Sequence, residues 1–148
     1  MTENEFFAYL AGFIDADGSI GIVTVAKSKT YVVQVCASNC NRIPIDMLQE
    51  RFGGKVRIRD WKNKKWKINY EWKLTSLKAI SVIEKILPYL RIKHEQAQLA
   101  IEAQLLKQKY TAAFLRWNQD VKEKRDHELE KLKLRCKKLN HRGRDQKE

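Results

Sequence analysis

The sequence is poor in cysteine and proline and contains no long apolar run. Its three cysteines, Cys36, Cys40 and Cys136, are odd in number and lie near no second Cys or His pair, which argues against a disulfide framework or a zinc finger. A bilayer-spanning helix needs roughly 18 consecutive apolar residues, and the N-terminus lacks the layout of a signal peptide. We therefore expect reduced structural thiols and a soluble intracellular protein, in a compartment that the sequence leaves open.

The chain has a large excess of positive charge. It carries 30 Lys and Arg against 18 Asp and Glu, a formal net charge of +12 over 148 residues. Residues 51–78 hold ten basic and two acidic groups, and residues 107–148 hold fourteen and seven. Such an excess indicates attraction to a polyanion, either nucleic acid or an anionic membrane.

Hydrophobic spacing predicts an α+β fold with the element order α-β-β-α-β-β-α-α. The expected helices cover 5–16, 42–52, 76–87 and 92–106. The expected strands form two hairpins and cover 19–27, 30–38, 55–60 and 67–75. Asn41 and Ser76 are the expected N-caps, and Pro88 should interrupt the third helix. Residues 1–108 would form the core domain, with 109–148 as a basic helical extension of it that frays into its last eight residues.

Alternation along the second hairpin predicts one apolar and one polar sheet face. The polar row contains Lys55, Arg57, Arg59, Lys67, Asn69, Glu71, Lys73 and Thr75. Arg and Asn can bond guanine and adenine edges, and a β-ribbon fits the major groove, so this row is a candidate DNA-binding face. A solvated antiparallel sheet gives the same pattern. The first hairpin offers fewer polar candidates, namely Lys27, Thr30 and Gln34.

Two acids and two small residues mark the first expected helix. Asp15 and Asp17 lie at its C-terminal end, where the helix dipole disfavours a carboxylate, so a compensating partner is expected. A divalent cation and a local hydrogen-bonding role both satisfy that expectation. Gly12 and Ala16, four residues apart, offer a smooth stripe for close helix packing, either between two copies of the chain or within one.

Residues 10–18 read LAGFIDADG, which resembles the LAGLIDADG signature with one Leu-to-Phe change. The resemblance extends over about residues 5–108. It includes the element order, the Phe-Gly-Gly helix end at 52–54, and the run PYLRIK at 88–93 followed by Gln96-Ala97. These features are similar to the single-motif branch of the LAGLIDADG homing endonucleases.

The resemblance implies a saddle-shaped antiparallel sheet that grips double-stranded DNA and a homodimer formed through the motif helices. It implies cleavage of a long pseudo-palindromic site with short 3′ overhangs. Asp17, assisted by the carbonyl of Ala16, would hold catalytic Mg²⁺, for which Mn²⁺ or Ca²⁺ could substitute in binding. Lys93 would hold or polarise the water network, and Gly12, Ala16 and the structural carboxylate Asp15 would lie at the interface.

The sheet residues that fall where relatives contact bases are Arg57, Arg59, Glu71 and Lys73. A glutamine that assists some relatives is replaced by Ala37, with Ser38 adjacent. Two alternatives stay open, an intron maturase or DNA- or RNA-binding relative without cleavage, and a basic ribosomal-type RNA-binding module. A membrane surface is disfavoured because the basic residues alternate along strands. The extension could follow DNA phosphates, extend the dimer or stay disordered.

Overall fold

The computed structural model describes residues 1–141 and confirms the expected element order. The helices are α1 (Glu3–Asp17), α2 (Arg42–Phe52), α3 (Ser76–Ile86), the 3-10 turn η1 (Leu87–Tyr89), α4 (His94–Gln108), α5 (Ala112–Trp117) and α6 (Gln119–Asn140). The strands are β1 (Gly18–Val25), β2 (Thr30–Asn39), β3 (Lys55–Arg59) and β4 (Asn69–Thr75). No described helix combines the length and hydropathy needed to cross a membrane.

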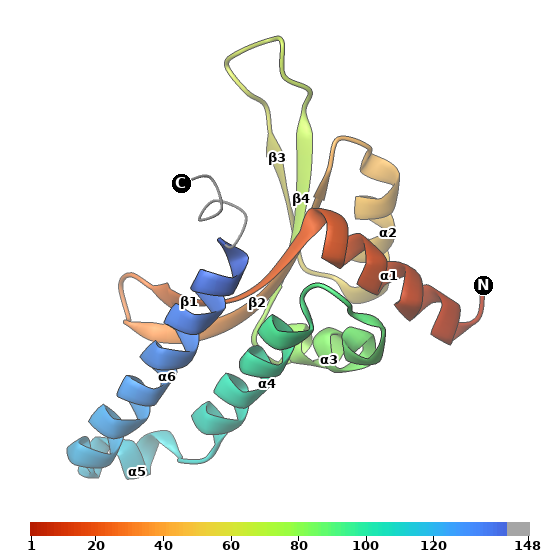
Figure 1. The fold of residues 1–148 in the computed structure, drawn as a ribbon. Helices are drawn as coiled ribbons and strands as arrows, with labels where there is room; N and C mark the ends of the chain where they lie inside the picture. Colours follow the sequence, from red (N-terminus) through yellow and green to blue (C-terminus); the bar gives the residue numbers. More distant parts are fainter. Residues whose placement is uncertain (142–148) are drawn as a thin grey trace, which may run out of the picture.

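The four strands form one antiparallel sheet in the order β1-β2-β4-β3. The buried strand residues alternate along β1, β2 and β4, among them Ile20, Val35 and Trp72, and the helices pack against this face (Figure 1). None of the residues between them, on the opposite face, falls in the buried class. The sheet therefore has one face in the core and one face available for contact, as an amphipathic antiparallel sheet should.

Local signals explain the ends of α1 and α2. Thr2 and Glu5 form a capping box at the start of α1, and the Asn41 side chain accepts from the Ile43 amide at the start of α2. Gly53 ends α2 with a φ of 70°, a left-handed conformation that favours glycine. Asn41 is thus confirmed as a cap.

Three expected boundaries are corrected. Ser76 does not cap α3: the helix follows Thr75 without a side-chain cap bond, and Ser76 itself has a φ of 57°. The first hairpin turn covers residues 26–29, so Lys27 lies in the turn and not on a strand. The strand expected from 67 begins at Asn69, so Lys67 lies in the second hairpin loop. The turn signals of Lys and Ser are weak, which is why spacing alone placed these ends wrongly.

Helix α6 packs on α4 and on the edge strand β1. Leu129 and Cys136 are fully buried in the same cluster as the strand residues. Cys136 Sγ and Asn140 Nδ2 both donate to the carbonyl of Ile20, at 3.4 and 3.0 Å, so the helix bonds to part of the open edge of β1. We propose on this basis that 109–148 extends the 1–108 domain. Most of the tail expected to fray, residues 142–148, lies outside the described residues.

Candidate nucleic-acid interface

The uncovered sheet face carries a connected row of polar side chains. Cross-strand pairing places Arg57 opposite Glu71, Arg59 opposite Asn69 and Lys55 opposite Lys73. Strand β2 continues the same face, because Cys36 pairs with Lys73, Ser38 with Glu71 and Gln34 with Thr75. The residues predicted from alternation on β2, β3 and β4 therefore share one surface. They are Thr30, Gln34, Arg57, Arg59, Asn69, Glu71 and Lys73.

Two members of this face are already paired with each other. Arg59 donates to Glu71 Oε2 at 2.8 Å, and the Glu71 side chain is only 16% exposed. The Nε of Arg59 is buried and has no hydrogen-bond partner among the described residues. Glu71 thus holds Arg59 in position on the sheet, whereas Arg57 is exposed and makes no ion pair within residues 1–141. Of the basic groups on β3 and β4, Lys55, Arg57 and Lys73 make no ion pair with another described residue, unlike Arg59.

A cavity of about 420 Å³ lies where α6 crosses β1. Its walls include Ser19 and Gln34 from the sheet, Lys133 and Lys137 from α6, and His141 directly after α6. The end of the helix therefore adds basic groups beside the sparsely charged first hairpin. The sequence placed no residue of α6 at this face, because the approach of residues more than a hundred positions apart in the chain is a tertiary feature.

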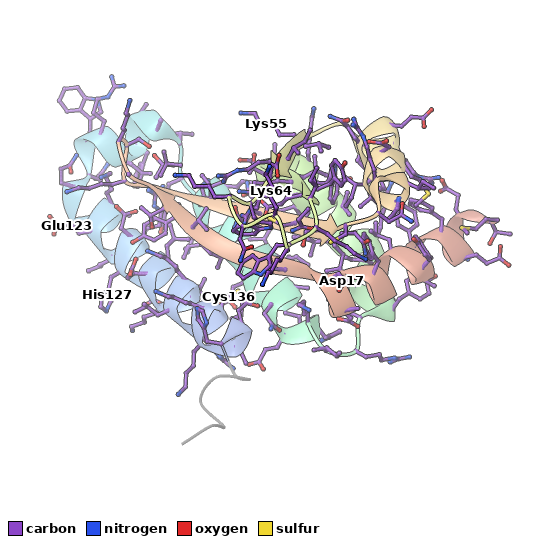
Figure 2. The ribbon with its side chains drawn as sticks, turned by 90° about the horizontal axis from the view of Figure 1, so that it is seen from above. Asp17, Lys55, Lys64, Glu123, His127 and Cys136 are labelled. Atoms are coloured by element: carbon purple, nitrogen blue, oxygen red, sulfur yellow. The ribbon has the colours of Figure 1, made fainter. Side chains whose placement is uncertain are left out.

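Asp17 is the exposed last residue of α1, at the point where the helix gives way to β1 (Figure 2). Asn39 Nδ2 donates to its Oδ2 at 3.2 Å, and Ser38 Oγ donates to its backbone carbonyl at 3.5 Å. Sequence reasoning missed Asn39, although a polar residue at the end of the strand that pairs with β1 was an available signal. Ala37, considered as the replacement for a helper glutamine, is fully buried in the core.

Asp15 turns toward its own chain. Its two carboxylate oxygens accept hydrogen bonds from the backbone N–H of Arg91, at 2.8 Å, and of Lys93, at 2.9 Å. Burial by itself raises the pKa of Asp15, but these hydrogen bonds outweigh burial and leave the pKa below its ordinary value. The carboxylate is therefore a structural link between α1 and the start of α4. Any interface role of Asp15 would be indirect.

Lys93 lies beside the same helix end. Its Nζ donates to the carbonyl oxygen of Asp15, one of the last-turn carbonyls that lack a helical partner. Burial lowers the pKa of the Lys93 ammonium, and the nearby negative charges of Asp15 and Asp17 offset part of that effect. The sequence prediction that Lys93 stands near Asp17 agrees with this geometry, and the lysine also satisfies α1 structurally.

Gly12 and Ala16 are exposed on α1. A Cβ built on Gly12 would meet no atom of residues 1–141 within 4 Å, so the stripe is not used for packing among the described residues. Beside the stripe, Tyr9, which is 44% exposed, stacks on Phe13 with the ring centroids 6.4 Å apart. An exposed helix face with small and aromatic residues suits packing against another molecule.

The donor set at the end of α1 is compatible with Mg²⁺ but not with a protein-enclosed metal. Within the described residues no three His, Cys, Asp or Glu side chains gather into a metal-binding group. Asp17 offers an exposed carboxylate, and Ala16 offers a last-turn carbonyl. Mg²⁺ usually keeps several waters and takes one or two carboxylates together with substrate phosphates. The residues present therefore fit a magnesium ion that is shared with a bound phosphodiester.

Comparison with known proteins identifies the fold. Neither a protein-family model nor a curated protein matches this sequence. Among solved structures, the homing endonuclease I-CvuI bound to a DNA target aligns with a TM-score of 0.69 and 21% identity, over 92% of this chain and 83% of that chain. The archaeal intron-encoded homing endonuclease I-Vdi141I complexed with DNA aligns with a TM-score of 0.59 and 18% identity, over 88% and 86%.

A third alignment differs in coverage. A double mutant of I-SmaMI aligns with a TM-score of 0.62 and 15% identity over 86% of this chain but 43% of that chain. A second structure of I-SmaMI is that of a LAGLIDADG homing endonuclease bound to cleaved DNA. The chain thus has the LAGLIDADG homing endonuclease fold, which confirms the fold predicted from the motif. It matches most of the I-CvuI and I-Vdi141I chains and less than half of the I-SmaMI chain.

Proposed function

We propose that this protein is a site-specific, double-strand DNA endonuclease of the LAGLIDADG homing type that acts as a homodimer. The observation that carries the proposal is the exposed carboxylate of Asp17 at the junction of α1 with a sheet whose free face is polar and basic. The likeness to structures described as DNA-bound homing endonucleases supports it. The non-cleaving or maturase alternative and the ribosomal-type module have no such support.

Binding in this proposal falls to the sheet. Arg57 and Lys73 reach outward from β3 and β4, and Arg59 is held by Glu71 at 2.8 Å. A guanidinium fixed in this way can approach a guanine edge with little loss of side-chain freedom. Thr30, Gln34 and Asn69 supply further hydrogen-bonding groups on the same face. Lys27 and Lys67, which lie in the hairpin turn and loop, would contact phosphates in preference to bases.

Strand cleavage is assigned to the end of α1. Asp17 and the carbonyl of Ala16 would hold Mg²⁺, for which Mn²⁺ or Ca²⁺ could substitute in binding. When bound, the ion supplies Lewis-acid stabilisation of the phosphate and the leaving 3′ oxygen. Asn39 keeps one Asp17 oxygen oriented through its 3.2 Å hydrogen bond. Lys93, whose Nζ donates to the Asp15 carbonyl, would orient water near the reacting phosphate.

Dimerisation is assigned to the exposed stripe of α1. Gly12 and Ala16 leave room for a second α1 at close distance, and two helices packed there would bring both Asp17 residues toward one DNA duplex. The coverage of the I-SmaMI chain, 43%, is consistent with this chain being one half of a complete nuclease. A symmetric dimer requires a palindromic or pseudo-palindromic target.

The test is an Asp17→Asn variant, compared with Asp46→Asn as a matched control on the exposed surface of α2. A library of randomised pseudo-palindromic duplexes is incubated with each protein in Mg²⁺ or Ca²⁺, and the ends produced are sequenced. We expect Mg²⁺-dependent cuts at one long site with short 3′ overhangs for the wild type and for Asp46→Asn. Asp17→Asn should bind the same site without cutting it. Full cleavage by Asp17→Asn would disprove the assignment, and binding without any wild-type cleavage would favour the alternative.

A further inference from the structure

The loop between β3 and β4 extends beyond the rest of the molecule (Figure 1). It comprises nine residues, 60–68, and we call it the lysine tip. All nine are exposed. The tip carries Lys62, Lys64, Lys65 and Lys67 against one acid, Asp60, and Figure 2 labels Lys64 within it. A hairpin can be closed with only two residues, so a loop of this length and charge is not needed to join the strands.

The tip has an internal structure of its own. The side-chain oxygen of Asn63 accepts from the Lys65 amide at 3.2 Å, and the Asn63 carbonyl accepts from the Trp66 amide at 3.0 Å, which together form a tight turn. Trp61 and Trp66 pack edge to face with their ring centroids 5.3 Å apart. Lys62, Lys64 and Lys65 lie between the two tryptophans in the sequence. The contact between the indoles stabilises the turn, and the two tryptophans stay 39% and 59% exposed.

The charge of the tip is not compensated inside the chain. Within residues 1–141 no ion pair involves any of its four lysines. Neighbouring like charges on a short loop repel one another, and a polyanion relieves that repulsion. The strand that leads into the tip carries Arg57 and Arg59 on the uncovered sheet face. The tip is therefore a continuation of the surface already proposed to bind DNA.

We propose that the lysine tip is a sequence-independent DNA contact, in which Lys62, Lys64 and Lys65 bind phosphates beyond the base pairs read by the strands. This inference rests on the proposed function. Lysine is a point charge on a flexible stem, suited to phosphates, whereas bases are read by the arginine and amide side chains of the strands. Trp61 and Trp66 are positioning residues, which present the lysines in one arrangement.

The test measures how DNA affinity depends on salt. The triple variant Lys62→Gln, Lys64→Gln, Lys65→Gln is compared with Lys78→Gln, Lys124→Gln, Lys131→Gln, three exposed lysines on α3 and α6. Each phosphate contact contributes about 0.9 to the slope of log K against log salt. The tip variant should lower the magnitude of the slope by about 2.7 for each protomer on the DNA. Its cleavage position should stay unchanged. The control should keep the wild-type slope.

A second pair of variants tests the tryptophans. Trp61→Ala, Trp66→Ala retains all four lysines, so a lower salt slope in this variant would show that the aromatic pair positions them. Trp61→Phe, Trp66→Phe should restore most of the slope because an edge-to-face pair can re-form. Acrylamide quenching is measured in a Trp117→Phe background, since Trp117 is the most exposed indole at 84%. The tip indoles should become shielded when duplex DNA is added.

The outcomes separate the tip from the wider proposal. A wild-type slope in the tip variant, together with indoles that stay accessible on DNA, would overturn the lysine-tip inference and leave the endonuclease untouched. Dissociation of a dimer by the tip variant, seen by sedimentation without DNA, would also overturn it, because the tip would then contact a second copy. Failure of the wild-type protein to bind any duplex would instead refute the proposed function.

Discussion

Replacing Gly12 by alanine separates a free helix surface from a dimer interface. Gly12 lies inside α1, and a Cβ at this position would meet nothing within 4 Å among residues 1–141 of the protomer. Alanine is about 1 kcal/mol more favourable than glycine in a helix interior. The protomer should therefore gain about 1 kcal/mol in its free energy of unfolding, as measured by urea denaturation at a protein concentration below dimer dissociation.

The dimer should respond in the opposite direction. Two added methyl groups would lie between closely packed helices, and overpacking of this kind costs about 1–3 kcal/mol. Since a tenfold change in affinity corresponds to about 1.4 kcal/mol, the dissociation constant of the dimer should rise roughly 5- to 150-fold. Sedimentation velocity over a concentration series measures this change, and DNA cleavage at low protein concentration should fall in parallel.

Two further variants calibrate the result. Ser81→Ala, at an exposed position of α3, should stabilise the protomer slightly and leave the dimer unchanged. Gly18→Ala should destabilise the protomer by about 3 kcal/mol, because its Cβ would lie 2.6 Å from the Cys36 carbonyl oxygen and 2.8 Å from Ile14 Cα. If Gly12→Ala stabilises the protomer and the dimer dissociates as before, α1 does not form the interface through this stripe.

The remaining predictions concern three titratable groups. Asp15 has a lowered pKa, so its carboxylate stabilises the fold above the ordinary carboxyl pKa, and this contribution is lost as pH falls through the folded-state pKa. The Asp15→Asn variant should lower the free energy of unfolding by about 1–2 kcal/mol at neutral pH. Below pH 4, the free energy of unfolding of this variant should change less with pH than that of the wild type. Burial and then the hydrogen bond to Glu130 raise the pKa of Tyr31 to about 12, so stability should decline as pH rises above 10; an absorbance titration in which Tyr31→Phe loses no late-ionising tyrosine would contradict this. Burial raises the pKa of the Cys136 thiol to about 11, whereas Cys40 is exposed; iodoacetamide followed by mass spectrometry should label Cys40 first, and equal labelling would refute the burial of Cys136.

Several site residues could be recognised from the sequence because their signals are local. The motif at 10–18 placed Asp17 at the end of a helix, and the glycine after it ends that helix as expected. Strand alternation placed Arg57, Glu71 and Lys73 on one face, since side chains alternate strictly along a strand. These predictions needed only periodicity within one element.

Other residues depended on contacts between elements. The sequence could not show that Asn39 bonds to Asp17, because the register between β1 and β2 determines which β2 residue lies beside the end of α1. It could not show that Glu71 is bonded to Arg59, which makes the acid a support for its neighbour. Ala37 was considered beside the site, but its position in the register turns it into the core.

The amino-acid sequence by itself determined the element order, the polar sheet face and the end of the motif helix, because each follows from spacing, alternation or a glycine at a helix end. Only the tertiary structure decided that Asp15 and Lys93 link α1 to α4, that α6 packs along the edge of β1, and that Gly12 faces outward. These features join residues far apart in the chain. Their geometry depends on how the elements pack together, which no local pattern encodes.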